Sequence, residues 1–230
     1  MYFYWGDFYY FLILIVPVLI LSIAAQIMME TTYKKYSNVK NRRGLSGAVV
    51  ARTILDSKGL TDVRIEMVNG RLTDHFDPRD NVVRLSEGNY NGTTISAVGV
   101  AAHEVGHAIQ YAEHYAPIKL RAAVIPATRF GSWFYFPLFL LGILFQMPTL
   151  AYIGVGLFAM IAIFQLITLP VEFNASNRAI KILNKDFVLD ADEVSGAKKV
   201  LTAAAMTYVA ALLMSIVQII RLVLIVRRND

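Results

Sequence analysis

Long stretches of apolar residues without a single charged side chain dominate the pattern of this chain, and the polar residues gather between them. The uncharged stretches are residues 8–29, 130–171 and 200–220, with 22, 42 and 21 residues. A helix needs about 20 apolar residues to cross a bilayer, so the first and last stretches each predict one transmembrane helix. The last helix extends to residue 226 if Arg221 reaches the membrane surface with its long side chain.

The middle stretch is too long for one span. At about 1.5 Å per residue its helix would measure about 63 Å, roughly twice the thickness of the hydrocarbon layer. Gln146-Met147-Pro148-Thr149 lies near its centre, and the residue before a proline disfavours helical geometry. The pattern therefore predicts two antiparallel spans, residues 130–147 and 149–171, joined by a tight hairpin.

The flanking charges predict an orientation for the four spans. Lysines and arginines concentrate in the two connecting segments, residues 30–129 and 172–199, while only Arg227 and Arg228 follow the last span. The positive-inside rule places the connecting segments in the cytoplasm, although the basic C-terminal end argues the other way. A cleaved signal peptide is the alternative for the first span, but no lysine or arginine precedes it, so we expect an uncleaved anchor.

Composition narrows the class of protein. Apolar residues make up 56% of the chain and charged residues 17%, against about 45–50% and about 25% in soluble domains. The chain has no cysteine, which excludes disulfides, thiolate nucleophiles and sulfur-ligated metals. Its net charge of +5 lies largely beside the apolar stretches, where it indicates topology rather than nucleic-acid binding.

The segment between the first two spans has the alternating patterns of a small α+β unit. Ser46 can cap a first helix and Gly59 can end it. Asn69-Gly70 favours a hairpin turn between two of three strands. The predicted elements are a helix at 47–58, an antiparallel sheet of strands 63–67, 71–76 and 81–86, and a helix at 95–112.

The second helix of this unit carries the motif His103-Glu104-Val105-Gly106-His107. Residues four apart on a helix lie about 40° apart around its axis and about 6 Å apart along it, so both imidazoles can reach one ion. Glu104 lies beside them, where it can hold a water molecule. This arrangement is typical of zinc peptidases, in which two histidines bind the metal and the glutamate is the general base. A structural metal site is the alternative.

A catalytic zinc ion normally takes a third protein ligand. His114 lies about 16 Å further along the same helix, too far to share the ion. His75 could approach from the sheet. Glu172 is the stronger candidate, because it is the first charge after the 42-residue stretch and shares a helical face with the small residues Ala175, Ser176 and Ala179.

Four segments resemble the YugP-like family of bacterial membrane zinc metallopeptidases, and the resemblance covers nearly the whole chain. They are His-Glu-Val-Gly-His-Ala-Ile-Gln at 103–110, Asp-His-Phe-Asp-Pro-Arg-Asp at 74–80, Val-Arg-Leu-Ser at 83–86 and Glu-Phe-Asn-Ala-Ser-Asn-Arg-Ala at 172–179. The chain is more distantly similar to the membrane peptidase HtpX and the type I CAAX prenyl proteases. The resemblance implies that Glu172 is the third ligand. This chain differs from those distant relatives at Ser176, where they carry an acidic residue.

These observations predict an integral protein of a bacterial cell membrane: an α+β chain with about four spans and a zincin-like unit facing the cytoplasm. One Zn²⁺ per chain, held by His103, His107 and Glu172, would support hydrolysis of peptides or membrane proteins, with Ser176 as a hydrogen-bond partner in the second shell. The candidate substrate contacts are Arg178, His75 and the strand residues Asn81, Val82, Val83 and Arg84. A scaffold or chaperone with a structural metal, and an intramembrane protease, are the alternatives.

Overall fold

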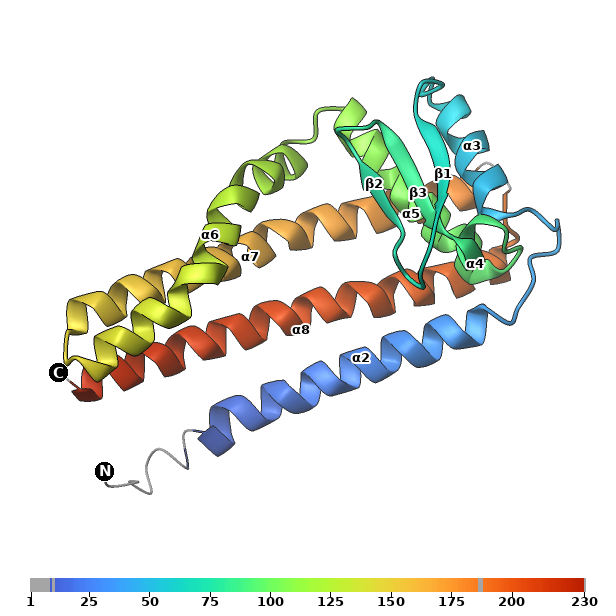
Figure 1. The fold of residues 1–230 in the computed structure, drawn as a ribbon. Helices are drawn as coiled ribbons and strands as arrows, with labels where there is room; N and C mark the ends of the chain where they lie inside the picture. Colours follow the sequence, from blue (N-terminus) through green and yellow to red (C-terminus); the bar gives the residue numbers. More distant parts are fainter. Residues whose placement is uncertain (1–8, 10, 186–187, 230) are drawn as a thin grey trace. The chain divides into compact units, whose positions relative to one another are not determined.

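The computed structural model describes residues 9, 11–185 and 188–229 and shows long helices with one small sheet (Figure 1). Its helices and strands are the π-helix η1 (Phe11–Ile15), α2 (Val16–Tyr36), α3 (Gly47–Ser57), β1 (Arg64–Val68), β2 (His75–Asp77), β3 (Val82–Ser86), α4 (Glu87–Tyr90), α5 (Ile95–Ala112), α6 (Ala116–Leu144), α7 (Pro148–Lys185) and α8 (Ala191–Asn229). They form two compact units, one of residues 27–119 and 170–206, the other from the remaining chain.

Among the residues that the structure describes, four helical stretches are long and apolar enough to cross a membrane, which confirms the predicted number. They are Leu12–Tyr36, Ala116–Leu144, Pro148–Lys185 and Ala191–Asn229. Phe8, the first residue of the predicted anchor, lies outside the described residues. The helices are longer than the uncharged stretches, and α7 continues past the last uncharged residue into the segment that carries Glu172.

In the unit of residues 1–26, 120–169 and 207–230, α6 and α7 form the predicted hairpin. The turn lies between Leu144 and Pro148, with Gln146 in the left-handed region at φ 55°. Glycines allow the two helices to touch, because a Cβ on Gly142 would lie 2.3 Å from the backbone nitrogen of Ala151. A small apolar core holds this unit together. Its buried side chains are Phe139, Ala151, Val155, Phe158, Leu222 and Val226.

The unit of residues 27–119 and 170–206 is built around α5. Ser46 caps α3 by accepting a hydrogen bond from the Val49 N–H, and Gly59 follows the helix at φ 72°, both as predicted. A continuous apolar core joins α3, α5, the sheet and the neighbouring parts of α7 and α8. Its fully buried side chains include Val50, Ile54, Leu55, Val83, Leu85, Val98, Val105, Ala179 and Leu183.

The sheet is mixed, so the predicted antiparallel meander is wrong in its topology. The strand order is β1-β3-β2, with β1 parallel and β2 antiparallel to β3. Residues 69–74 form a connection rather than a two-residue turn, which leaves room for β3 between the other strands (Figure 1). The physical reason is burial: Val82, Val83 and Leu85 make β3 the most apolar strand, and the central position buries it.

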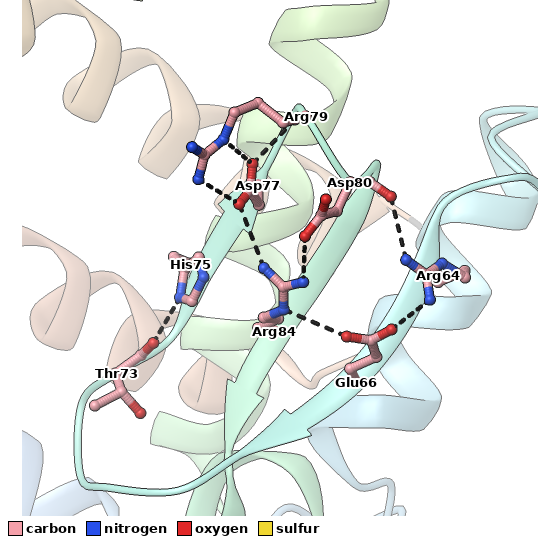
Figure 2. Close-up of polar contacts among 8 residues, drawn as sticks. All are labelled: Arg64, Glu66, Thr73, His75, Asp77, Arg79, Asp80 and Arg84. Carbon is pink, nitrogen blue, oxygen red and sulfur yellow. Dashed lines mark hydrogen bonds and ion pairs between the residues drawn. The ribbon is translucent and has the colours of Figure 1, made fainter. Parts of the chain in front are cut away.

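Arg84 connects all three strands on the face of the sheet that points away from the core (Figure 2). Its guanidinium contacts Asp80 at 2.6 Å, Glu66 at 3.3 Å and Asp77 at 3.3 Å. Asp77 also accepts hydrogen bonds from the side chain and the backbone N–H of Arg79. These bonds hold the pKa of Asp77 well below its usual range.

Replacing Arg84 with alanine is expected to destabilise the sheet by about 1–2 kcal/mol, because it leaves three neighbouring carboxylates without their shared cation. In a chain of this size the midpoint of thermal unfolding in detergent should fall by about 2–8 °C. Arg64→Ala is the matched control, since its side chain is 61% exposed and pairs with one carboxylate, that of Glu66, beside a 3.3 Å hydrogen bond to the Asp80 carbonyl oxygen. Equal midpoints for the two variants would contradict the connecting role of Arg84.

Candidate metal centre

Helix α5 lies at the centre of its unit and carries the two histidines of the motif. Thr94 caps its N-terminus by accepting a hydrogen bond from the Ala97 N–H. Fourteen of its 18 residues are buried, which explains its many alanines and glycines, since elements pack against several of its faces. His103 and His107 lie one turn apart on the same face, with their ring centroids 4.8 Å apart and nearly perpendicular.

Helix α7 crosses α5 at Gly106, between the two histidines. A Cβ at this position would lie 2.8 Å from the carbonyl oxygen of Ala175 and 3.2 Å from its Cα. Only glycine therefore permits this separation of the two backbones. Ala175 is itself fully buried, so both helices contribute a small residue to the crossing. Glu172 lies one turn before Ala175 on α7 and is brought opposite the histidines.

The side chains of His103, His107 and Glu172 converge in space. One possible ligand atom from each lies within 4.8 Å of the others. Glu172 Oε2 is 3.3 Å from His103 Nε2 and 3.7 Å from His107 Nε2. Two imidazole nitrogens and one carboxylate oxygen form a donor set that suits a catalytic zinc ion and leaves one position open. The donor chemistry of this group thus fits the metal that the sequence predicts.

Each histidine also has a polar partner at its other ring nitrogen. Ser176 Oγ lies 3.1 Å from His103 Nδ1, as the sequence-based role for Ser176 requires. Gln110 Oε1 lies 2.9 Å from His107 Nδ1, a contact that the sequence analysis missed. Its signal was the spacing, because residues three apart on a helix are neighbours.

Glu104 lies beside the histidines and is buried, with 8% of its surface exposed. Burial raises the pKa of Glu104, although the charges of His103 and His107 act in the opposite direction. Burial lowers the pKa of His107, but Glu172 and Glu104 outweigh this effect and raise it. The negative field that favours a proton on His107 also favours a bound cation.

The structure places His75 away from this group. His75 and Asp77 alternate with Phe76 along β2, so their side chains point to the opposite face of the sheet. Phe76 packs against Tyr111 of α5, with the rings 5.6 Å apart. His75 is exposed, and its Nδ1 lies 2.8 Å from the Thr73 carbonyl oxygen (Figure 2).

The predicted substrate strand requires a correction. The sequence analysis named Asn81, Val82, Val83 and Arg84 as candidate contacts for substrate. Strand β3 is paired with β1 on one side and with β2 on the other, so it has no edge along which an extended peptide could add. The guanidinium of Arg84 is occupied by three carboxylates.

Arg178 is the remaining candidate contact, and it lies near the metal group on α7. Its Nε donates to Asn174 Oδ1 at 2.7 Å, and its Nη1 lies 2.6 Å from Glu113 Oε2. These contacts hold the guanidinium between α7 and the C-terminal end of α5. A role in binding substrate remains a prediction.

The chain is similar to known proteins over most of its length. A family described as "Putative neutral zinc metallopeptidase" matches residues 11–227. A protein of Bacillus subtilis (strain 168), "Putative membrane protease YugP", is 47% identical over 215 residues, which cover 94% of this chain and 96% of that protein. No solved structure matches the chain significantly.

Gly106→Ala is expected to force α5 and α7 apart and to destabilise their unit by about 1–3 kcal/mol, because the added methyl group overlaps the Ala175 backbone. The midpoint of thermal unfolding should fall by about 2–12 °C. Gly156→Ala within α7 is the control, since a Cβ there meets open space. Equal unfolding midpoints for the two variants would show that the crossing does not depend on Gly106.

Proposed function

Since the chain belongs to this family of neutral zinc metallopeptidases, we propose that it is a membrane-anchored zinc endopeptidase with His103, His107 and Glu172 as metal ligands. The observation that carries the proposal is the convergence of three ligand atoms within 4.8 Å beside the buried carboxylate of Glu104. A structural metal site needs no additional carboxylate at that place. One ion per chain is expected, because the group supplies one set of three ligands.

Zinc bound to this group would polarise the scissile carbonyl and make a water molecule more acidic. In the proposed mechanism Glu104 accepts the proton of the attacking water and then donates it to the nitrogen of the leaving amine. Burial suits this exchange because a carboxylate with a raised pKa holds a proton more readily. Ser176 and Gln110 contact the other ring nitrogens of the two histidines and would keep the rings oriented toward a bound metal.

We propose that an extended substrate pairs with the outer edge of β2 rather than with β3. Strand β2 is at the edge of the sheet, and Phe76 attaches it to Tyr111 on the metal-binding helix. Pairing through main-chain hydrogen bonds places few demands on substrate sequence. His75, exposed on β2, would then contact substrate side chains on the outer face of the sheet.

The substrates proposed are polypeptides at the membrane surface, including membrane proteins. Glu172 follows 24 residues of α7 without a charge. At about 1.5 Å per residue these form about 36 Å of helix, enough to cross about 30 Å of hydrocarbon and bring the carboxylate to its boundary. The lysines and arginines of the connecting segments support a cytoplasmic position for the catalytic unit.

Glu104→Gln is expected to lower hydrolysis of fluorescein-labelled casein by about 10²–10⁴-fold, because the amide cannot accept the proton of water. Metal analysis of the same preparation should still find one zinc ion per chain, since the three ligands are unchanged. Glu87→Gln, an exposed glutamate in α4, is the matched control and should cleave casein at the wild-type rate. A wild-type rate in Glu104→Gln would refute its role as the base.

His103→Ala and Glu172→Ala are each expected to lose most of the bound zinc, because two protein ligands hold the ion far less tightly than three. Elemental analysis after equilibration with limiting zinc gives the stoichiometry. His75→Ala and His114→Ala should retain one ion per chain. Retention in Glu172→Ala together with loss in His75→Ala would overturn the ligand assignment.

A further inference from the structure

Behind His107 a chain of hydrogen bonds runs from the metal group to the surface of the protein. Gln110 is fully buried, and its Oε1 contacts His107 Nδ1 at 2.9 Å. Its Nε2 donates to the Val171 carbonyl oxygen and to Asn174 Oδ1, both at 2.9 Å. Asn174 Oδ1 also accepts from Arg178 Nε. The chain ends where Arg178 meets the half-exposed carboxylate of Glu113.

The direction of these hydrogen bonds is fixed by groups that have a single role. The Val171 carbonyl can only accept, and the Arg178 guanidinium can only donate. Gln110 must therefore direct its NH₂ group toward Val171, and Asn174 must direct its oxygen toward Arg178. This leaves the oxygen of Gln110 to face His107, so Nδ1 of that ring must carry the hydrogen.

We infer that Gln110 is a positioning residue that holds the neutral His107 ring as the Nδ1–H tautomer, with the Nε2 lone pair directed at the metal position before the metal arrives. This inference rests on the proposed zinc site but assigns a role to residues outside the ligand set. Asn174 and Arg178 act through Gln110, because they prevent its amide from rotating. Such partners of metal ligands typically contribute 10- to 100-fold to metal affinity.

At His103, the partner of Nδ1 does not fix the tautomer in the way that Gln110 does at His107. Its Nδ1 faces the hydroxyl of Ser176, and a hydroxyl can either donate or accept. Ser176 therefore orients the ring without selecting its tautomer. The two ligands on α5 therefore differ. Gln110 holds the hydrogen of His107 on Nδ1, whereas His103 Nε2 lies 3.3 Å from the Glu172 carboxylate, which accepts and so favours the hydrogen on Nε2. His103 must therefore change tautomer when its Nε2 binds the ion.

The tautomer is measured in metal-free protein, purified in detergent and labelled with ¹⁵N at histidine. The chain has four histidines, so the signals of His107 can be assigned by substitution. At a pH where the ring is neutral, two-bond ¹H–¹⁵N spectra should show the Nδ1–H form in the wild type. Gln110→Met, of similar length but without an acceptor, should show a mixture enriched in the common Nε2–H form.

Zinc affinity, measured by competition with a chromophoric chelator, should fall by about 10–100-fold in Gln110→Met. Gln218→Met on α8 makes the same chemical change away from the group and should bind zinc as the wild type does. Asn174→Asp keeps an acceptor for both Gln110 and Arg178, so it should preserve the tautomer. Asn174→Leu removes one of the two acceptors that hold the Gln110 amide and leaves the Val171 carbonyl in place, so it should shift the tautomer less than Gln110→Met. Gln110→Leu, which also lacks an acceptor, covers the case in which Gln110→Met does not fold.

An unchanged tautomer and a zinc affinity within about twofold of the wild type in the folded Gln110→Met or Gln110→Leu variant would overturn the inference. The two proposals fail in different ways. A wild-type protein that binds no zinc would refute the proposed peptidase site, whereas the tautomer measurement is made without metal. An Nε2–H form of His107 in the wild type would refute the role of Gln110 even if zinc binds and casein is cleaved.

Discussion

The close contact between the backbones of α5 and α7 is the constraint on which the metal group depends. Two histidines one turn apart on a helix can supply two metal ligands. The third protein ligand must come from elsewhere in the chain. In the proposed site it is Glu172, 65 positions after His107, on a helix that touches the first at Gly106 and Ala175. A larger side chain at either position would force the two backbones apart and shift the Glu172 carboxylate relative to the histidines.

The same contact explains why polar groups are tolerated in the core of this unit. Gln110 and Glu172 are buried where α5 and α7 meet, and a buried polar group without a partner costs free energy. Each potential donor or acceptor of the Gln110 amide described above meets a complementary group. The network therefore costs little stability while fixing the relative rotation of the two helices.

The sequence revealed the parts of the structure that follow from local pattern. Apolar length predicted four spans, and Ser46 and Gly59 marked the ends of α3. A stretch rich in alanine and valine predicted a helix over 95–112, where the structure has Ile95–Ala112. The order of the strands was beyond this reasoning, because it depends on which strand buries the most apolar surface after collapse. Alternation along β2 could have excluded His75 as a ligand, but only once Phe76 was known to face α5.

For Glu172, the sequence predicted a close helix contact but not the hydrogen bonds around it. Small residues at its helical spacing indicated a close helix contact, and the structure contains one. The path from Asn174 to His107 was beyond the sequence, because it joins Gln110 of α5 to residues that follow Pro170 in α7. A proline inside a helix leaves one carbonyl without its usual N–H partner and permits a bend there. The two compact units also divide between Leu169 and Pro170. Glu172, Asn174, Ser176 and Arg178 all follow this point, in the same unit as α5, so a bend at Pro170 would leave the contacts of the metal group unchanged.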